Sequence, residues 1–215
     1  MKKTILFDLD GTIIDPKTGI VRSYSRALTE MGFADKIGDN MDWVIGPPLR
    51  QSFATIVPPH RIEEAVTLYR SFHAESGLIE ANIYDDIWRV IANISERGHR
   101  LFICTAKDTP FARKNIEQFG LSQFFQKIYG SHLDGTFDDK AELMAHILKV
   151  HDLNPNEVIM IGDREHDIIA AKKNHLNGYG ALWGYGSAGE LLKAGAKQLF
   201  ETPNDFLEFI ISDNG

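Results

Sequence analysis

Two carboxylates follow a short apolar run near the start of the chain, in the stretch ILFDLDGTIID. The run Ile5–Phe7 predicts the end of a buried strand. Asp8 and Asp10 lie two positions apart, so on an extended chain they would share one face. Like charges side by side cost stability unless something compensates them. A strand end with a turn or capping aspartate is the simpler alternative, but the polar residues further along the chain favour a functional pair.

Polar residues follow two later apolar runs in the same way. Thr105 follows the run LFIC, and Asp163 follows VIMIG, with Asp167 four positions further on. Lys140 opens a predicted helix between these two runs. If the strands are neighbours in a parallel sheet, their carboxyl ends bring acids, a hydroxyl group and a lysine into one small volume.

Such a convergence suits phosphoryl transfer. Thr105 and Lys140 can donate to the equatorial oxygens of a transferring phosphoryl group, and aspartate serves as a covalent nucleophile in such reactions. The Gly-rich loop of P-loop kinases and ATPases is missing, so their nucleotide-driven chemistry is not indicated. Clustered oxygen ligands suit Mg²⁺, which accepts few protein oxygens and keeps water and substrate phosphate as its other ligands. The ligands that we expect are Asp8, the backbone carbonyl of Asp10, Asp163 and Asp167.

The alternation of elements predicts an α/β fold with a Rossmann-like parallel sheet. Strands buried on both faces read as continuous apolar runs, and helices between them imply right-handed crossovers. The strands are expected at 5–7, 100–106, 127–131, 157–163 and 178–184, and the helices at 86–98, 111–120, 139–152 and 167–175.

The block 16–82 interrupts this alternation. It shows no convincing strand, whereas 18–33 and 61–77 have the apolar spacing of amphipathic helices and a short helix follows the turn GPP. We therefore expect two domains. Residues 1–15 and 83–215 would form the α/β core, and residues 16–82 a small all-helical domain inserted after the first strand.

Composition limits the remaining classes of function. The 215 residues, 43% hydrophobic and 25% charged, suffice for a sizeable core, and a net charge of -7 disfavours nucleic acid as a partner. The one cysteine, Cys104, excludes an intrachain disulfide and fits a cytoplasmic location. Asp8 interrupts the first apolar run, so no signal peptide or membrane span is predicted. The oligomeric state is not readable.

The chain resembles the haloacid dehalogenase superfamily, in its phosphatase branch, over nearly its whole length. Any one motif is weak, but four in the right order are specific. The tail GYGSAGELLKAGA resembles the phosphoglycolate-phosphatase-like group, and the helical insert has the position of that superfamily's small helical cap. The first motif, Asp-x-Asp-x-Thr, matches Asp8, Asp10 and Thr12; the second matches Thr105; the third matches Lys140; the fourth, Gly-Asp-x-x-x-Asp, matches Gly162, Asp163 and Asp167.

The resemblance implies a role for each of these residues. Asp8 would attack phosphorus and form an aspartyl-phosphate, and Asp10 would protonate the leaving oxygen and then activate water. Thr105, the backbone amide of Ala106 and Lys140 would hold the phosphoryl group. The ligands implied for Mg²⁺ are Asp8, Asp10, Asp163 and Asp167.

The second motif reads TAKD, where many relatives carry Asn or Ser second and Pro fourth. The amide of Ala106 can still donate to phosphate, but a side-chain contact is missing, which bears on substrate preference. Lys107 is a rival to Lys140 as a phosphate ligand, and Lys140 is favoured because it opens a helix as the third motif does. Arg50 is readable either as a ligand of a substrate anion or as a solvated surface residue.

The sequence therefore predicts a Mg²⁺-dependent phosphatase that acts on a small phosphorylated metabolite, with phosphoglycolate favoured as the substrate. A nucleoside 5'-monophosphate is the main alternative. A non-catalytic binding or regulatory protein that retains the fold is a further one. The interior of the cap decides between substrates, and it cannot be built from the sequence.

Overall fold

The computed structural model describes residues 2–212, and residues 1 and 213–215 lie outside the described part. The chain divides into two compact units, one made of residues 1–15 and 83–215 and the other of residues 16–82. Among the described residues, no helix is both long and apolar enough to cross a membrane.

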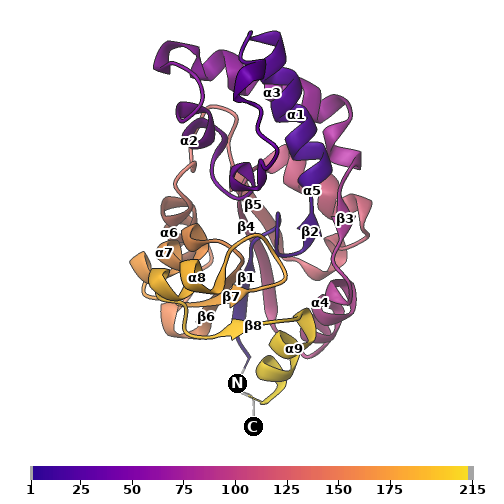
Figure 1. Cartoon of the computed structure of the whole chain (residues 1–215). Coiled ribbons are helices and arrows are strands. Elements are labelled where there is room, and N and C mark those ends of the chain that lie inside the picture. Colours follow the sequence, from indigo (N-terminus) through magenta and orange to yellow (C-terminus); the bar gives the residue numbers. More distant parts are fainter. Residues whose placement is uncertain (1, 213–215) are drawn as a thin grey trace. The chain divides into compact units, whose positions relative to one another are not determined.

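The first unit is built on a six-stranded sheet with the order β5-β4-β1-β6-β7-β8 (Figure 1). All neighbouring strands run parallel, which confirms the expected α/β fold. The chain passes from β1 to β4 on one side and later returns to β6 on the other, so β1 marks the switch point of the sheet. The strands are β1 (Thr4–Phe7), β4 (Arg100–Asp108), β5 (Lys127–Ser131), β6 (Val158–Gly162), β7 (Asn177–Ala181) and β8 (Leu199–Phe200).

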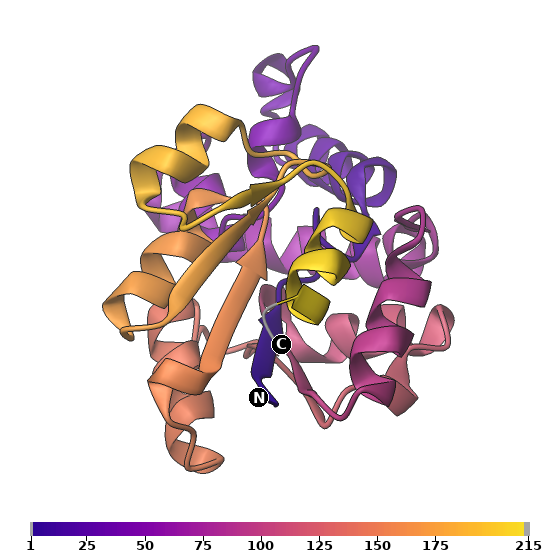
Figure 2. The same ribbon diagram turned by 90° about the horizontal axis from the view of Figure 1, so that it is seen from below.

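Helices cover both faces of this sheet (Figure 2). On one face α6, α7 and α8 pack side by side, and on the other α4 packs against α9, with α5 nearby. The central strands are buried along their whole length, as strands covered on both faces must be. The helices are α4 (Ile87–Glu96), α5 (Thr109–Gln118), α6 (Lys140–Val150), α7 (Glu165–Lys173), α8 (Ala188–Ala194) and α9 (Pro203–Ser212).

Five helices and strands of the described residues were not expected from the sequence, and α8 is one of them. β8 and α9 extend the sheet and its helical cover after the strand predicted as the last. β2 (Ile14–Asp15) and β3 (Asn82–Ile83) form a separate two-stranded sheet. Strands of two residues carry too little periodicity to be recognised in a sequence.

The second unit is helical, and the described residues between α1 and β3 contain no strand. Its centre is a cluster of aromatic rings that are tilted against one another. The ring centroid of Tyr24 lies 4.5 Å from that of Phe53 and 4.8 Å from that of Tyr69. α1 and α3 pack against each other, and α2 packs on α3. The elements are α1 (Lys17–Glu30), α2 (Leu49–Ala54) and α3 (Ile62–Glu75), with short 3-10 turns at Ala34–Lys36, Asp42–Val44, Pro59–Arg61 and Gly77–Ile79.

Candidate active site

The pairing of β1 with β6 brings Asp8 and Asp163 together. The register places Phe7 opposite Ile161, so the residues that directly follow the two strands leave the sheet side by side at its carboxyl edge. The Asp8 N–H donates to the Ile161 carbonyl at 3.0 Å, which extends the ladder by one residue. The first and fourth motifs are therefore neighbours because their strands are.

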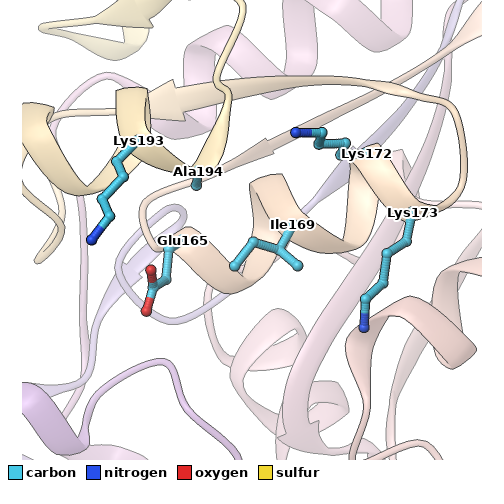
Figure 3. A pocket seen from close by; sticks show the side chains of 6 residues that line it. All are labelled: Glu165, Ile169, Lys172, Lys173, Lys193 and Ala194. Carbon is cyan, nitrogen blue, oxygen red and sulfur yellow. The ribbon is translucent and has the colours of Figure 1, made fainter.

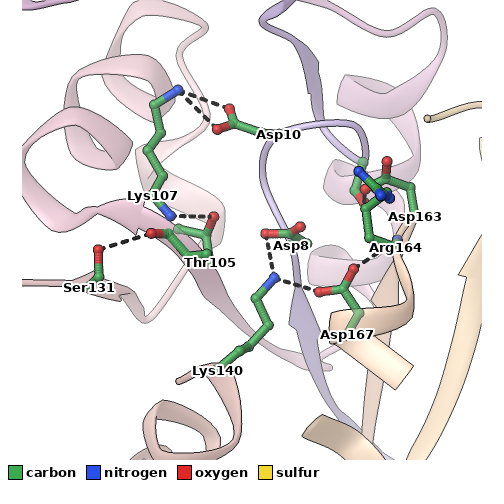
Figure 4. Close-up of polar contacts among 11 residues, drawn as sticks. Asp8, Asp10, Thr105, Lys107, Ser131, Lys140, Asp163, Arg164 and Asp167 are labelled. Carbon is green, nitrogen blue, oxygen red and sulfur yellow. Dashed lines mark hydrogen bonds and ion pairs between the residues drawn. The ribbon is translucent and has the colours of Figure 1, made fainter. Parts of the chain in front are cut away.

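Asp8, Asp163 and Asp167 form a buried acidic cluster (Figure 4). One carboxylate oxygen from each lies within 4.8 Å of the others, and the three residues are 2%, 0% and 0% exposed. Asp167 lies in the first turn of α7, where its Oδ2 accepts a hydrogen bond from the Arg164 N–H at 3.1 Å. The carboxylates expected as cation ligands are thus assembled at one point.

Lys140 supplies the positive charge that faces the acidic cluster. It is the first residue of α6, whose cap Asp139 accepts a hydrogen bond from the Ala141 N–H at 2.7 Å. Its Nζ lies 3.1 Å from Asp8 Oδ1 and 2.5 Å from Asp167 Oδ1. Burial opposes this charge, but the two carboxylates raise the pKa of Lys140 above its usual value. The lysine therefore stays protonated and forms an ion pair with Asp8.

The carboxylate of Asp10 pairs with Lys107 (Figure 4). Lys107 Nζ lies 2.9 Å from Oδ1 and 3.2 Å from Oδ2, and the side chains are only 7% and 10% exposed. The sequence indicated Lys107 as a rival phosphate ligand and gave no sign of this ion pair. Burial raises the pKa of Asp10, and Lys107 opposes that rise. Asp8 and Asp10 therefore have different counter-charges although they are two residues apart.

β4 does not end at Thr105, as the apolar run suggested. It continues to Asp108, and its pairing with β5 shifts between Cys104 and Asp108. Four steps along β4 there oppose two steps along β5, from Tyr129 to Ser131. A bulge of this kind redirects side chains at a sheet edge, and it carries the second motif.

Two hydrogen bonds hold this bulge in place. The Ser131 hydroxyl donates to the Ala106 carbonyl at 2.9 Å, and the Lys107 N–H donates to Thr105 Oγ1 at 3.3 Å. Because β4 is the neighbour of β1, the segment lies at the same edge of the sheet as Asp8. Thr105 and Ala106, the expected phosphate ligands, are therefore placed beside the expected nucleophile.

The acidic cluster has three carboxyl groups but, among the described residues, only the Lys140 ammonium group in contact with them, and burial makes their ionised forms less favourable. Burial raises the pKa of Asp8 to about 6. Burial, with the charges of Asp167 and Asp8 added, raises the pKa of Asp163 well above its usual value. The Asp8 Oδ1 atom is buried and lies 3.1 Å from the Lys140 ammonium group. Oxygen donors in excess over one ammonium group suit a hard divalent cation, so Asp8, Asp163 and Asp167 fit Mg²⁺.

Two further contacts to Asp163 were not foreseen. Thr12 Oγ1 donates to Oδ1 at 3.3 Å, and the Tyr185 N–H donates to Oδ2 at 2.9 Å. Gly11 has a φ of +85°, and a Cβ there would lie 2.2 Å from Asp163 Oδ2. The signal for Tyr185 was the glycine-spaced segment WGYGS, which follows a strand of the same sheet.

Arg50, left open by the sequence, lies at the start of α2 in the helical unit. Its Nε is 2.6 Å from Glu63 Oε1, and its NH2 group is 2.9 Å from Glu63 Oε2. In this bidentate ion pair the Arg50 side chain is 25% exposed and the Glu63 side chain is 68% exposed, so Arg50 is partly buried and paired with a surface carboxylate.

A shallow hollow of about 420 Å³ lies between α7 and α8, outside the acidic cluster (Figure 3). Its lysines are exposed surface side chains, and it lacks the buried, converging polar groups of the cluster. It is not part of the candidate active site. Its lining residues are Glu165, Ile169, Lys172, Lys173, Lys193 and Ala194.

A buried acidic site at the switch point of a parallel sheet defines an α/β protein whose polar groups converge where such sheets bind their ligands. The family model of haloacid dehalogenase-like hydrolases matches residues 5–180. The chain belongs to this family, as its four motifs indicated.

Individual relatives carry different names. The chain is 40% identical to a 5'-nucleotidase of Pseudomonas aeruginosa, over 87% of this chain and 86% of that protein. It is 33% identical to the tyrosine-protein kinase PtkA of Mycobacterium tuberculosis, over 86% of this chain but only 63% of that protein. It is 28% identical to a phosphoglycolate phosphatase of Aquifex aeolicus, over 85% of this chain and 86% of that one.

A solved structure, described as a predicted phosphatase from Clostridium acetobutylicum, matches with a TM-score of 0.93 at 30% identity. The match covers 99% of this chain and 100% of that chain. The fold therefore agrees with that of this relative over its whole length.

Replacing Asp163 by asparagine should stabilise the metal-free protein at pH 7, by about 1–2 kcal/mol. Asparagine keeps the shape that fits against Gly11 and removes an incompletely balanced buried charge. A carboxyl whose pKa is higher in the folded than in the unfolded state destabilises the fold increasingly as the pH rises above the unfolded-state pKa, until the folded-state pKa is passed. The advantage of Asp163→Asn should therefore shrink as the pH falls towards about 4.

Urea denaturation of the wild type and Asp163→Asn between pH 4.5 and 8, in the presence of a chelator, measures this difference. Addition of Mg²⁺ should stabilise the wild type more than the variant. A variant that is less stable than the wild type at pH 7 without metal, or a difference independent of pH, would contradict the account of the cluster.

Replacing Lys140 by methionine should lower the stability of the metal-free protein. It leaves Asp8 and Asp167 without their ammonium partner, and breaking one side of a buried ion pair costs about 3–5 kcal/mol. Lys173→Met is the matched control, because Lys173 lies 3.7 Å from Asp139 in an exposed pair and should change stability by less than about 1 kcal/mol. Equal effects of the two substitutions on the urea midpoint would show that Lys140 does not balance the cluster.

Proposed function

We propose that this protein is a Mg²⁺-dependent phosphatase that hydrolyses small phosphate monoesters through an aspartyl-phosphate on Asp8. The observation that carries the proposal is the division of labour between two neighbouring carboxylates. Asp8 lies in the acidic cluster against Lys140, whereas Asp10 is turned to Lys107. This difference supports Asp8 as the carboxylate that attacks phosphorus and Asp10 as the one that exchanges a proton.

In the first half of the reaction, an oxygen of Asp8 bonds to phosphorus and the bond from phosphorus to the leaving oxygen breaks. Asp10 gives its proton to that oxygen, so the alcohol departs neutral. In the second half, Asp10 takes a proton from water as the water oxygen attacks phosphorus, and the acyl-phosphate bond to Asp8 breaks. The products are the alcohol and inorganic phosphate, and both aspartates return to their initial states.

The surrounding residues support these steps from fixed positions. Lys140 favours the ionised form of Asp8, which is the form that attacks. The Thr105 hydroxyl and the backbone at Ala106 are held at the same sheet edge by the β4 bulge, where they would donate to phosphoryl oxygens. Asp8, Asp163 and Asp167, with the carbonyl of Asp10, would hold Mg²⁺, which when bound supplies positive charge to the phosphoryl oxygens.

For the substrate, the similarities favour a nucleoside 5'-monophosphate over phosphoglycolate. The relative named 5'-nucleotidase is 40% identical and the one named phosphoglycolate phosphatase 28% identical, over nearly equal shares of the chain. This reverses the order suggested by the tail motif. Phosphoglycolate stays the second candidate, because both relatives match along most of their lengths.

A substrate panel tests this proposal. The purified protein should release phosphate from nucleoside 5'-monophosphates with a higher kcat/KM than from phosphoglycolate, and activity should disappear with excess EDTA and return with Mg²⁺. Phosphoglycolate as the better substrate would reverse the order of the candidates. Turnover that persists in excess EDTA would remove the metal from the mechanism.

Asp10→Asn should slow the hydrolysis of alkyl phosphates by about 10²–10⁴-fold, the usual scale for a lost general acid or base. The step that forms the aspartyl-phosphate should slow less for p-nitrophenyl phosphate, because p-nitrophenolate leaves without a proton. Rapid-quench kinetics separates this step from the hydrolysis of the intermediate. Glu96→Gln, an exposed carboxylate-to-amide change on α4, is the control. Equal losses in the first step for good and poor leaving groups would exclude Asp10 as the acid.

A further inference from the structure

The segment that follows β7, residues 182–187, lies directly against Asp163; we call it the β7–α8 loop. A Cβ on Gly184 would lie 2.4 Å from the Asp163 Cβ, and a Cβ on Gly186 would lie 1.9 Å from the Asp163 carbonyl oxygen. Both distances are impossible for real atoms, so only glycine allows this approach. The loop is therefore shaped to contact Asp163.

Hydrogen bonds from this loop reach Asp163 and the chain that follows β1. The Tyr185 N–H donates to Asp163 Oδ2 at 2.9 Å, and Trp183 Nε1 donates to the Thr12 carbonyl at 2.9 Å. Thr12 Oγ1 in turn donates to Asp163 Oδ1 at 3.3 Å. Both carboxylate oxygens are thus held by segments distant in sequence, and the two segments also hold each other.

The side chain of Tyr185 extends this network to the two segments of the first unit that connect to the helical unit. Its hydroxyl donates to Asp15 Oδ1 and is hydrogen-bonded to the Tyr84 phenol. Burial raises the pKa of both phenols, so both stay neutral and able to donate. Asp15 is the last residue before the helical unit, and Tyr84 follows directly on the chain's return at Ile83. One phenol therefore contacts both connecting segments.

The same two segments are also bonded to each other. The Tyr84 N–H donates to the Ile13 carbonyl at 3.1 Å. The Tyr185 hydroxyl contacts both segments, and the Tyr185 N–H contacts Asp163. The orientation of Asp163 and the order of the two segments therefore both depend on Tyr185. Coupling of this kind is reciprocal, so a cation bound at Asp163 stabilises the segments by as much as the segments favour the cation.

We propose that Tyr185 is a positioning residue that ties the cation ligand Asp163 to the two segments, residues 13–15 and 83–85, through which the chain leaves and re-enters the first unit. Cation binding at the acidic cluster and order in these segments then reinforce each other. The inference rests on the proposed Mg²⁺ site but adds a role that the phosphatase reaction does not require.

Calorimetric titration with Mg²⁺ alone tests the first half of the inference. Tyr185→Phe removes the hydroxyl bonds to Asp15 and Tyr84 and keeps the backbone N–H. It should weaken Mg²⁺ binding, but by less than the roughly 10–100-fold that loss of a direct partner of a metal ligand costs, because the N–H that donates to Asp163 is kept. Tyr179→Phe is the control, because Tyr179 lies on β7 and packs against Phe200 and Phe209; it should bind Mg²⁺ as the wild type does.

Hydrogen–deuterium exchange tests the second half. In the wild type, Mg²⁺ should slow exchange in peptides that contain residues 13–15 and 83–85, and in Tyr185→Phe this protection should be lost. Wild-type Mg²⁺ affinity in a folded Tyr185→Phe variant, or unchanged protection of the two segments, would overturn the inference while leaving the phosphatase proposal intact. A wild type that binds no Mg²⁺ would overturn both.

Discussion

The structure depends on one electrostatic constraint, which is that three buried carboxylates share a small volume with one ammonium group. Asp8, Asp163 and Asp167 converge within 4.8 Å, and Lys140 contacts two of them. Unpaired charge is unfavourable in a protein interior unless it is matched by a partner or an ion. The parallel sheet imposes this proximity, because β1 and β6 are hydrogen-bonded neighbours in a fixed register.

The same constraint links stability to function. The cluster is unfavourable without a cation, and this excess of buried negative charge would favour a divalent ion beside Asp8, the proposed nucleophile. The fold holds the arrangement by close contacts that leave the acids little freedom, with Gly11, Gly184 and Gly186 set against Asp163. Asp10 is kept apart by its own partner, Lys107, so the two aspartates of one short motif experience different environments and are suited to different chemical tasks.

Much of this arrangement follows from local sequence. The apolar runs before Asp8, Thr105 and Asp163 predicted three strands of one parallel sheet. The structure shows that β4 and β6 both pair with β1, which brings the ends of the three strands together. A helix was also predicted over 139–152, and the structure begins it at Lys140 with Asp139 as its cap. These features depend on periodicity and on residues close in sequence.

The features that were missed depend on contacts between distant residues. The bulge that redirects Lys107 is held by Ser131 on another strand, and the contact of Tyr185 with Asp163 requires the β7–α8 loop to fold back over β6. Neither contact is predicted by a pattern in the neighbouring sequence. The substrate was unreadable for a different reason, because the four motifs describe how a phosphoryl group is handled and not what carries it. The most direct test of the central claim is to trap the covalent intermediate with borohydride during turnover and to map the modified residue by mass spectrometry. The account predicts homoserine in place of aspartate at position 8 only; modification at Asp10 or Asp163, or normal turnover with no modified aspartate, would contradict it.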